Sequence, residues 1–213
     1  MAEQEILNVR LGEGDRSVVL LDQSQLPNRV EYRTAARLPD MVEAIQSLRV
    51  RGAPAIGIFA GYCLYVLARQ LMEQGVSGSA FLDELDRQGK VLVSSRPTAV
   101  NLAWAVGRLT HLAVRMSGAP VEDIVSALGE EARAIRREDE EMCQKIAEHG
   151  LSLLKPGDGV LTHCNAGPLA TSKYGTALGP ILLGRERGIP LKVFADETRP
   201  LLQGARLTAW ELV

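Results

Sequence analysis

A cysteine at the end of an expected strand is the residue of this sequence best placed to do chemistry. Cys164 closes a short apolar run that follows a turn signal at 155–159, and small and polar residues come directly after it. This pattern predicts a buried strand that enters a tight loop, with a helix beginning near Pro168. A helix N-terminus favours a thiolate over a thiol, and sites in open α/β sheets form at the carboxyl ends of strands. We therefore interpret Cys164 as a reactive residue.

Two arginines are candidate ligands for an anion. Arg51 and Arg96 each precede a glycine or proline at the expected start of a helix, so side-chain and backbone N–H groups could converge on one phosphate. Gly52, next to Arg51, permits a close backbone approach. Neither segment contains a P-loop or a dinucleotide-binding fingerprint. The sequence implies no cofactor, and it shows no cysteine and histidine cluster at metal-ligand spacing.

The polar neighbours of these residues allow weaker alternatives. His163 precedes Cys164 on the expected strand, and adjacent strand residues face opposite sides, so a Cys–His pair is disfavoured. Asp196 and Glu197 follow a second expected strand and could face the same crevice as Cys164. Structural hydrogen bonding is the favoured interpretation of this acidic pair, with an acid/base role as the alternative.

Composition places the chain among ordinary globular proteins. Its 213 residues carry a net charge of -2, with 46% hydrophobic and 23% charged residues, so no polyanionic partner such as nucleic acid is expected. The three cysteines are widely separated, and Cys63 and Cys143 fall inside helical patterns, where we interpret them as structural. Without a disulfide pattern or a signal-like apolar region near the N-terminus, a reduced, cytoplasmic protein is expected.

One segment is apolar enough to suggest a membrane helix. It runs over 53–68 between Arg51 and Arg69, and it contains glycines and tyrosines. A membrane-spanning helix needs about 20 apolar residues, which is more than this run supplies. A helix buried in the protein core is the favoured interpretation, and no membrane partner is expected.

The order of patterns along the chain predicts an α/β protein with two parts. Residues 5–35 indicate a small antiparallel β-ribbon, and a helical region follows it. After residue 150 the pattern alternates strand, helix, strand and helix, which predicts right-handed crossovers and a parallel sheet. The expected helices are 39–48, 54–71, 79–93, 98–116 and 120–149, followed by a strand at 160–164, a helix at 168–186, a strand at 191–195 and a helix at 203–213.

These patterns predict an N-terminal strand and helical domain over 1–150 and the start of a second domain over 151–213. The last residues stop inside a helical pattern without a cap, and two parallel strands alone make a poor sheet. We therefore expect the second domain to be incomplete in this chain, which would be the front part of a longer protein. Such a piece should expose an unfinished sheet edge and associate.

Five ordered motifs spread over the whole chain carry a family resemblance. Together they resemble the family of S-methyl-5-thioribose-1-phosphate isomerase, the aldose–ketose isomerase of methionine salvage. This family is related to ribose-1,5-bisphosphate isomerases and to non-catalytic regulatory subunits of a translation-initiation guanine-nucleotide exchange factor. The motifs are Arg-Gly-Ala-Pro-Ala-Ile-Gly at 51–57, Arg-Pro-Thr-Ala-Val-Asn-Leu at 96–102, Leu-Thr-His-Cys-Asn-Ala-Gly at 161–167, Tyr-Gly-Thr-Ala-Leu-Gly at 174–179, and the segment 196–212.

The resemblance implies an architecture and a set of roles. It implies a small N-terminal domain, a Rossmann-like C-terminal domain and a homodimer. Cys164 matches the catalytic cysteine of the family. The residues that match its substrate-binding positions are Arg51, Gly52, Ala53, Arg96 and Gln203. The family's catalytic aspartate and an Asn-Lys pair that contacts substrate lie in later motifs, and no residue of this sequence matches them.

Three functions remain as hypotheses. The first is an isomerase that converts 5-methylthioribose 1-phosphate into 5-methylthioribulose 1-phosphate. Phosphate on the anomeric carbon locks the sugar ring, so this reaction needs an acid at the ring oxygen and a group that handles hydrogen at C2. The second is a regulatory or ligand-sensing subunit that keeps the fold without the chemistry. The third is a related isomerase acting on a deoxypentose phosphate or a bisphosphate.

Overall fold

The N-terminal part of the protein contains a small antiparallel sheet. The structure is a computed structural model that describes residues 7–213, so the first two positions of the predicted ribbon lie outside the described residues. Strands β1 (Val9–Leu11), β2 (Val18–Leu21) and β3 (Tyr32–Ala35) pair in the order β1-β2-β3, with β2 in the centre. All four residues of β2 are buried because the strand is a continuous apolar run. The predicted ribbon is confirmed.

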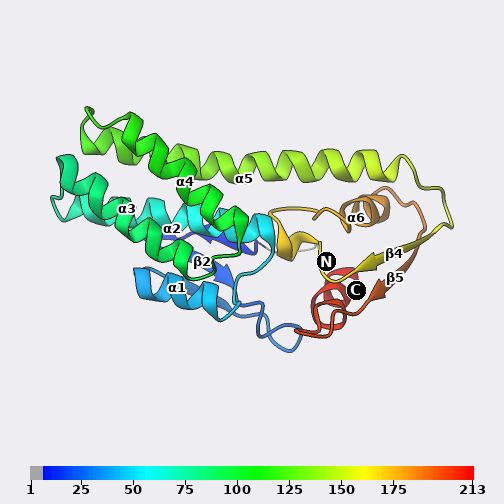
Figure 1. Ribbon diagram of the computed structural model, residues 1–213. Helices are drawn as coiled ribbons and strands as arrows, with labels where there is room; N and C mark the ends of the chain where they lie inside the picture. Colours follow the sequence, from blue (N-terminus) through cyan, green and yellow to red (C-terminus); the bar gives the residue numbers. More distant parts are fainter. Residues whose placement is uncertain (1–6) are drawn as a thin grey trace.

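Five helices follow along the chain, and α1 (Leu38–Gln46) and α2 (Ala53–Glu73) among them contact this sheet (Figure 1). Helices α3 (Gly78–Ser94), α4 (Val100–Arg115) and α5 (Val121–Leu151) pack around α2, and α1 precedes it. Helix α2 is the one helix within 7–213 that is long and apolar enough to cross a membrane, and 83% of its most apolar window is buried inside the protein. Burial on nearly every side is what a central core helix requires, so the predicted core role is confirmed.

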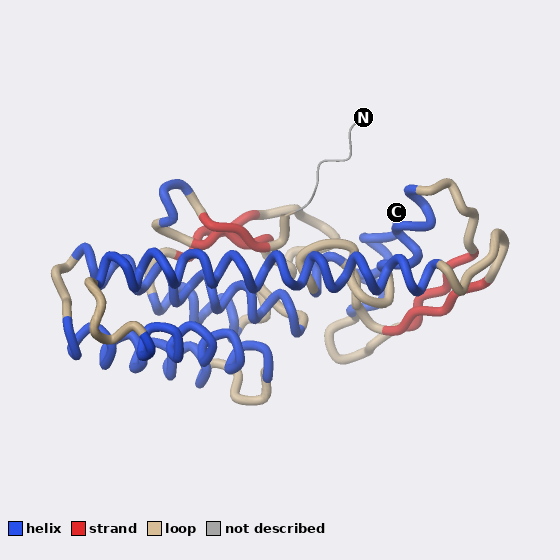
Figure 2. The backbone as a smooth tube through the Cα atoms, turned by 90° about the horizontal axis from the view of Figure 1, so that it is seen from above, coloured by secondary structure: helices blue, strands red, loops and turns tan. Residues whose placement is uncertain are grey.

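Helix α5 joins the two ends of the molecule. It spans 31 residues and extends along the protein, as Figure 2 shows from above. Its first turns pack on α2, whereas its last turns pack on α6 (Gly179–Glu186). Ala147 and Leu151 of α5 form an apolar cluster there with Leu183 of α6. The predicted helix over 120–149 is confirmed.

The C-terminal part contains a pair of parallel strands. Strand β4 (Gly159–His163) pairs with β5 (Lys192–Asp196), and α6 lies between them in the chain. The register places Val160 opposite Val193 and His163 opposite Asp196. This strand–helix–strand arrangement confirms the predicted parallel pairing.

The helix predicted over 168–186 is wrong in its first half. Only a short 3₁₀ turn, Pro168–Ala170, follows Cys164, and α6 begins at Gly179. Gly175 and Tyr174 adopt positive φ angles, and the Thr176 N–H donates to the carbonyl of Ala166 at 2.9 Å, so the segment folds back on itself. Cys164 therefore does not precede the N-terminus of an α-helix, which removes the electrostatic reason we gave for a thiolate there.

The end of the chain is helical, as predicted, with an irregular start. A π-helical turn, Gly204–Thr208, runs into α7 (Ala209–Leu212). Leu207 of this turn packs with Leu21, Leu26 and Leu169, in a cluster beside the N-terminal sheet. The C-terminal segment therefore contacts both the N-terminal part and the turn after Cys164.

Candidate active site

The connection between α1 and α2 presses against the loop that follows Cys164. Gly52 in this connection has φ +93°, and a Cβ atom there would lie 2.6 Å from the carbonyl oxygen of Ala170. Only glycine allows both the backbone angle and this approach. The contact places Arg51 beside Asn165, to whose side-chain oxygen Oδ1 the Arg51 Nη1 donates at 2.7 Å. The close approach that we predicted at Gly52 is thus made to the protein's own backbone.

A cavity of about 450 Å³ opens at this connection. All five residues that match the family's substrate-binding positions line it: Arg51, Gly52, Ala53, Arg96 and Gln203. The other lining residues come from α2, the start of α4, the segments before these two helices and the segment after β5: Leu48, Ile56, Thr98, Ala99, Val100, Asn101 and Leu201. The fold therefore brings together residues that are more than 150 positions apart in the sequence.

Arg51 carries a charge that no carboxylate neutralises directly. Its hydrogen bonds go to the side chain and backbone carbonyl of Asn165, a neutral residue. Burial lowers the pKa of Arg51, the nearby Cys164 and Glu211 act to raise it, and the like charge of Arg96 lowers it further. Arg96 has no side-chain hydrogen bond or ion pair to the part of the chain that the structure describes. Two neighbouring guanidinium groups without carboxylate partners favour an anionic ligand in the cavity.

Cys164 lies beside this cavity and does not form its wall. The residue is partly buried, its thiol is free, and it adopts a left-handed backbone conformation with φ 61°. Its carbonyl oxygen accepts a hydrogen bond from the Thr208 hydroxyl, which fixes the peptide. A non-glycine residue in this conformation is strained, and such strain is concentrated at functional sites. Cys164 directly precedes Asn165, to which Arg51 donates, so Cys164 lies close to one of the two cavity arginines.

Behind Arg51 lies a polar network that the sequence patterns did not indicate. The Asn165 Nδ2 group donates to Oε2 of Glu211 and, at 3.2 Å, to the Thr208 hydroxyl. Glu211 also accepts the Leu169 N–H at 2.6 Å. Burial raises the pKa of Glu211 to about 7, against the opposing effects of these hydrogen bonds and of Arg51. Glu211 thus titrates near neutral pH, one residue removed from the cavity arginine.

The remaining candidates have structural surroundings. His163 and Asp196 face each other across the two strands, with 3.9 Å between Nδ1 and Oδ2, and both side chains are exposed. Glu197 accepts the N–H groups of Gly204 at 3.3 Å and Ala205 at 2.7 Å, so it caps the π-helical turn. The structural interpretation of Glu197 is confirmed. No hydrogen bond joins His163 to Cys164 among residues 7–213.

The other two cysteines are buried in the helical layer. Burial raises the pKa of Cys63 well above its usual value, and burial together with Asp139 raises the pKa of Cys143 to about 11. Both thiols stay protonated at neutral pH, which makes them poor nucleophiles. Their structural interpretation is confirmed. Within the described chain, no three His, Cys, Asp or Glu side chains gather closely enough to hold a metal ion.

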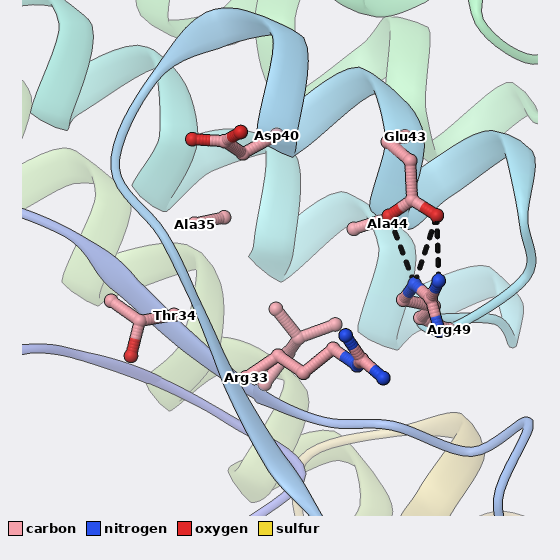
Figure 3. A pocket seen from close by; sticks show the side chains of 8 residues that line it. Arg33, Thr34, Ala35, Asp40, Glu43, Ala44 and Arg49 are labelled. Atoms are coloured by element: carbon pink, nitrogen blue, oxygen red, sulfur yellow. Dashed lines mark hydrogen bonds and ion pairs between the residues drawn. The ribbon is translucent and has the colours of Figure 1, made fainter.

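A second cavity, of about 310 Å³, lies between the N-terminal sheet and α1 (Figure 3). Arg49 on its wall donates to Glu43 at 2.7 Å and to the buried Asp22 at 2.6 Å. Arg33 donates to the same Asp22 at 2.6 Å. Carboxylates therefore neutralise the charges in this cavity, unlike those in the first.

Comparison with known proteins places the chain in a family. The sequence profile described as the initiation factor 2 subunit family matches residues 49–213. The chain belongs to this family. Among curated members, it is 51% identical to the methylthioribose-1-phosphate isomerase of Symbiobacterium thermophilum, covering 99% of this chain and 58% of that protein. It is 49% identical to the 5-deoxyribose 1-phosphate isomerase of Petrotoga mobilis, covering 97% of this chain and 59% of that one.

Solved structures of the family share this fold. The 5-methylthioribose 1-phosphate isomerase of Pyrococcus horikoshii superposes with a TM-score of 0.89 at 36% identity, covering 98% of this chain and 57% of that one. The eIF-2B delta subunit of A. fulgidus gives a TM-score of 0.84 at 37% identity, covering 98% and 59%. The resemblance inferred from the five motifs is confirmed, as is the mixed α/β class. The chain spans less than two thirds of the length of these relatives.

Proposed function

We propose that this protein is a sugar-phosphate isomerase that interconverts 5-methylthioribose 1-phosphate and 5-methylthioribulose 1-phosphate. One observation carries the proposal: Arg51, Arg96 and Gln203 line a single cavity beside the strained Cys164. The names of the relatives at 51% and 50% identity support the same chemistry. The proposed ligand is a small sugar phosphate, with no cofactor.

The substrate's phosphate would bind between the two arginines. Arg51 retains a guanidinium that is hydrogen-bonded only to Asn165, and Arg96 has its donors available within the described structure. Ala53 begins the 21-residue helix α2, so free N–H groups and the positive end of the helix dipole lie at the same cavity. Arginine forks match phosphate oxygens better than lysine does, because they donate two parallel hydrogen bonds.

The reaction moves hydrogen within the sugar. The bond between C1 and the ring oxygen breaks and the ring oxygen takes a proton, hydrogen moves from C2 to C1, and the 2-hydroxyl loses its proton as C2 becomes a carbonyl. Atoms and electrons balance without an external oxidant. We assign to Cys164 one of the two proton-handling roles, because it directly precedes Asn165, to which the arginine that would hold the phosphate donates. The second role belongs to the family's aspartate, which no residue of this sequence matches.

Replacement of Cys164 tests this assignment. In a full-length version that includes the family's catalytic aspartate, Cys164→Ser should lower the turnover of 5-methylthioribose 1-phosphate by about 100-fold or more while leaving its binding nearly unchanged, since a general acid–base group contributes about that much. Cys143→Ala is the matched control, because it removes a buried thiol away from the cavity and should retain turnover. Near-normal turnover in Cys164→Ser would remove this residue from the mechanism.

A related isomerase and a regulatory subunit are the alternative functions. The identity to 5-deoxyribose 1-phosphate isomerases favours the first, and the TM-score of 0.84 to an eIF-2B subunit favours the second. Turnover of 5-deoxyribose 1-phosphate in preference to the methylthio sugar would select the related isomerase. Absence of turnover with every sugar phosphate, together with saturable binding of a nucleotide, would select the regulatory subunit.

Three further features belong to the same proposal. We assign residues 1–150 to an N-terminal domain and residues 151–213 to a Rossmann-like domain that begins with β4, in agreement with the parallel pairing of β4 and β5. We propose a homodimer in solution, which light scattering tests. A reducing cytoplasmic location agrees with the three cysteines, all of which are free.

A further inference from the structure

A small chamber of about 110 Å³ adjoins the cavity that holds the two arginines. The two spaces share four lining residues: Leu48, Arg51, Leu201 and Gln203. Five further residues line the chamber and do not line the larger cavity: Gln23, Ser24, Ser47, Arg206 and Leu207. A single water needs about 10–15 Å³ of such space, so the chamber has room for several water-sized groups. It is therefore large enough to take part of a ligand held at Arg51.

Gln23 lines this chamber and has a buried side-chain oxygen without a hydrogen-bond partner among the described residues. The residue is 2% exposed, and its Nε2 group donates to the Leu169 carbonyl at 2.8 Å. Because that carbonyl only accepts, the amide orientation is fixed, and Oε1 is left without a hydrogen-bond partner within residues 7–213. The backbone N–H of Gln23 donates to the Arg49 carbonyl at 2.9 Å, so the whole residue is held in place.

Gln203, which also lines the chamber, has an amide oxygen in the same condition. Oε1 of Gln203 is buried and has no partner among the described residues. Within residues 7–213, five buried side-chain oxygens share this condition, and two of them belong to Gln23 and Gln203, which both line this chamber. Most buried polar groups in proteins are hydrogen-bonded, so two unpaired acceptors at one space indicate that their donors come from a ligand.

Arg206 holds the segments that carry Gln23 and Gln203 together, but it donates to backbone carbonyls and not to the side-chain oxygens of the two glutamines. Its guanidinium donates to the backbone carbonyls of Gln23 at 3.1 Å, Leu26 at 2.9 Å and Leu201 at 3.0 Å. These bonds attach the segment after β2 to the segment that contains Gln203. The geometry around Gln23 is therefore built before any ligand binds.

We propose that Gln23 is a substrate-binding residue whose Oε1 accepts a hydrogen bond from a hydroxyl of the sugar. This inference rests on the proposed function, and it assigns the chamber to the sugar's vicinal diol. The furanose ring of 5-methylthioribose 1-phosphate carries two hydroxyls, at C2 and C3, which equals the number of unpaired acceptors. Arg51 lines both the larger cavity and the chamber. One sugar phosphate could therefore place its phosphate between Arg51 and Arg96 and its diol beside Gln23 and Gln203.

Calorimetric binding to the purified protein tests the assignment. Gln23→Met should weaken the binding of ribose 1-phosphate by about 5- to 10-fold, the value of one hydrogen bond, and leave inorganic phosphate binding unchanged. With one of the two analogues, 2-deoxyribose or 3-deoxyribose 1-phosphate, the variant should bind as well as the unsubstituted protein, because the partner hydroxyl is already missing. An equal loss with both analogues would overturn the inference.

Asn8→Leu is the matched control. Asn8 is also buried and also donates to the Leu169 carbonyl, at 3.2 Å, but it does not line the chamber. Gln23→Met must therefore weaken ribose 1-phosphate binding more than Asn8→Leu does, and equal effects would assign Gln23 to a structural role. Arg51→Ala separates the two proposals: unchanged phosphate binding in this variant contradicts the proposed function. If Arg51→Ala weakens phosphate binding but Gln23→Met does not weaken ribose 1-phosphate binding, only the Gln23 assignment is contradicted.

Discussion

Arg49 and Arg51 lie two positions apart on the connection between α1 and α2, yet they enter cavities of opposite character. Arg49 donates to the carboxylates of Glu43 and Asp22, and these hydrogen bonds raise the pKa of Arg49. Arg51 donates to the neutral Asn165, and burial lowers the pKa of Arg51. One cavity is neutralised by the protein itself, whereas the other retains positive charge in a partly desolvated place.

This difference separates a structural arginine from a ligand-binding one. A buried arginine without a carboxylate is unfavourable unless another anion accompanies it, because desolvation penalises the charged form. The Arg49 cavity is satisfied in the folded protein and needs no ligand. The Arg51 cavity, with Arg96 on its wall, is completed by an anion such as the phosphate we propose.

Among the substitutions considered, Gly52→Ala is expected to have the largest effect on stability, because Gly52 holds the Arg51 segment against Ala170. Gly52→Ala should lower the free energy of unfolding by about 3–4 kcal/mol, because the left-handed conformation costs about 1–2 kcal/mol and the new Cβ would meet the Ala170 carbonyl oxygen at 2.6 Å. Urea unfolding measures this loss. The matched control is Gly75→Ala, which has φ +76° but open space around it, and which should lose about 1 kcal/mol. Equal losses at both positions would show that the contact with Ala170 is not tight.

Exchanging each arginine for alanine tests the comparison directly. Arg51→Ala should weaken inorganic phosphate binding by about 100-fold, because it removes a pair of charge-assisted donors. The stability should change little, because the substitution also removes a desolvated charge that no carboxylate within residues 7–213 pairs. Arg49→Ala should leave phosphate binding unchanged and lower the free energy of unfolding by about 2–3 kcal/mol, because the buried Asp22 keeps only Arg33 and Ser24. Calorimetry and urea unfolding on both variants separate the two effects. The reverse pattern would invert our assignment of the cavities.

Much of the fold could be predicted because its signals are local. Helix α5 follows a continuous apolar period, and β2 is an unbroken apolar run, so each segment indicates its own state. The segment 168–178 was predicted wrongly because distant residues determine it. The Asn8 side chain donates to the Pro168 carbonyl at 3.0 Å, and Glu211 accepts the Leu169 N–H. No window around residue 168 contains those partners.

The candidate site divides in the same way. Arg51, Arg96 and Gln203 could be named because they lie in recognisable motifs, and the structure brings all three to one cavity. Gln23 and Glu211 could not, because a glutamine after a strand and a glutamate in a helical pattern are ordinary surface residues until the fold buries them. Their chemistry comes from burial and missing partners, which are properties of the tertiary structure.

Ionisation of Glu211 should make the charge at the Arg51 cavity depend on pH. A carboxylate near Arg51 makes this cavity more like the neutralised Arg49 cavity. Burial raises the pKa of Glu211 to about 7, above its value of 4.5 in a model peptide, so the folded state favours the protonated form. Its contribution to stability is complete below about pH 4.5 and is lost as pH rises through 7. We expect the free energy of unfolding to fall by about 2 kcal/mol between pH 5 and pH 8 through this group, and Glu211→Gln to remove that part of the fall.

Ionised Glu211 should also act on the ligand. Above pH 7 its carboxylate lies behind Arg51, joined to it through Asn165, and offsets part of the charge that attracts an anion. Sulfate, whose charge is constant over this range, should therefore bind about three-fold more weakly at pH 8 than at pH 6. In Glu211→Gln the two affinities should agree. If the glutamine variant keeps the full pH dependence of sulfate binding, a group other than Glu211 titrates at the cavity. Glu211 would then not act on Arg51 as the carboxylates of Glu43 and Asp22 act on Arg49.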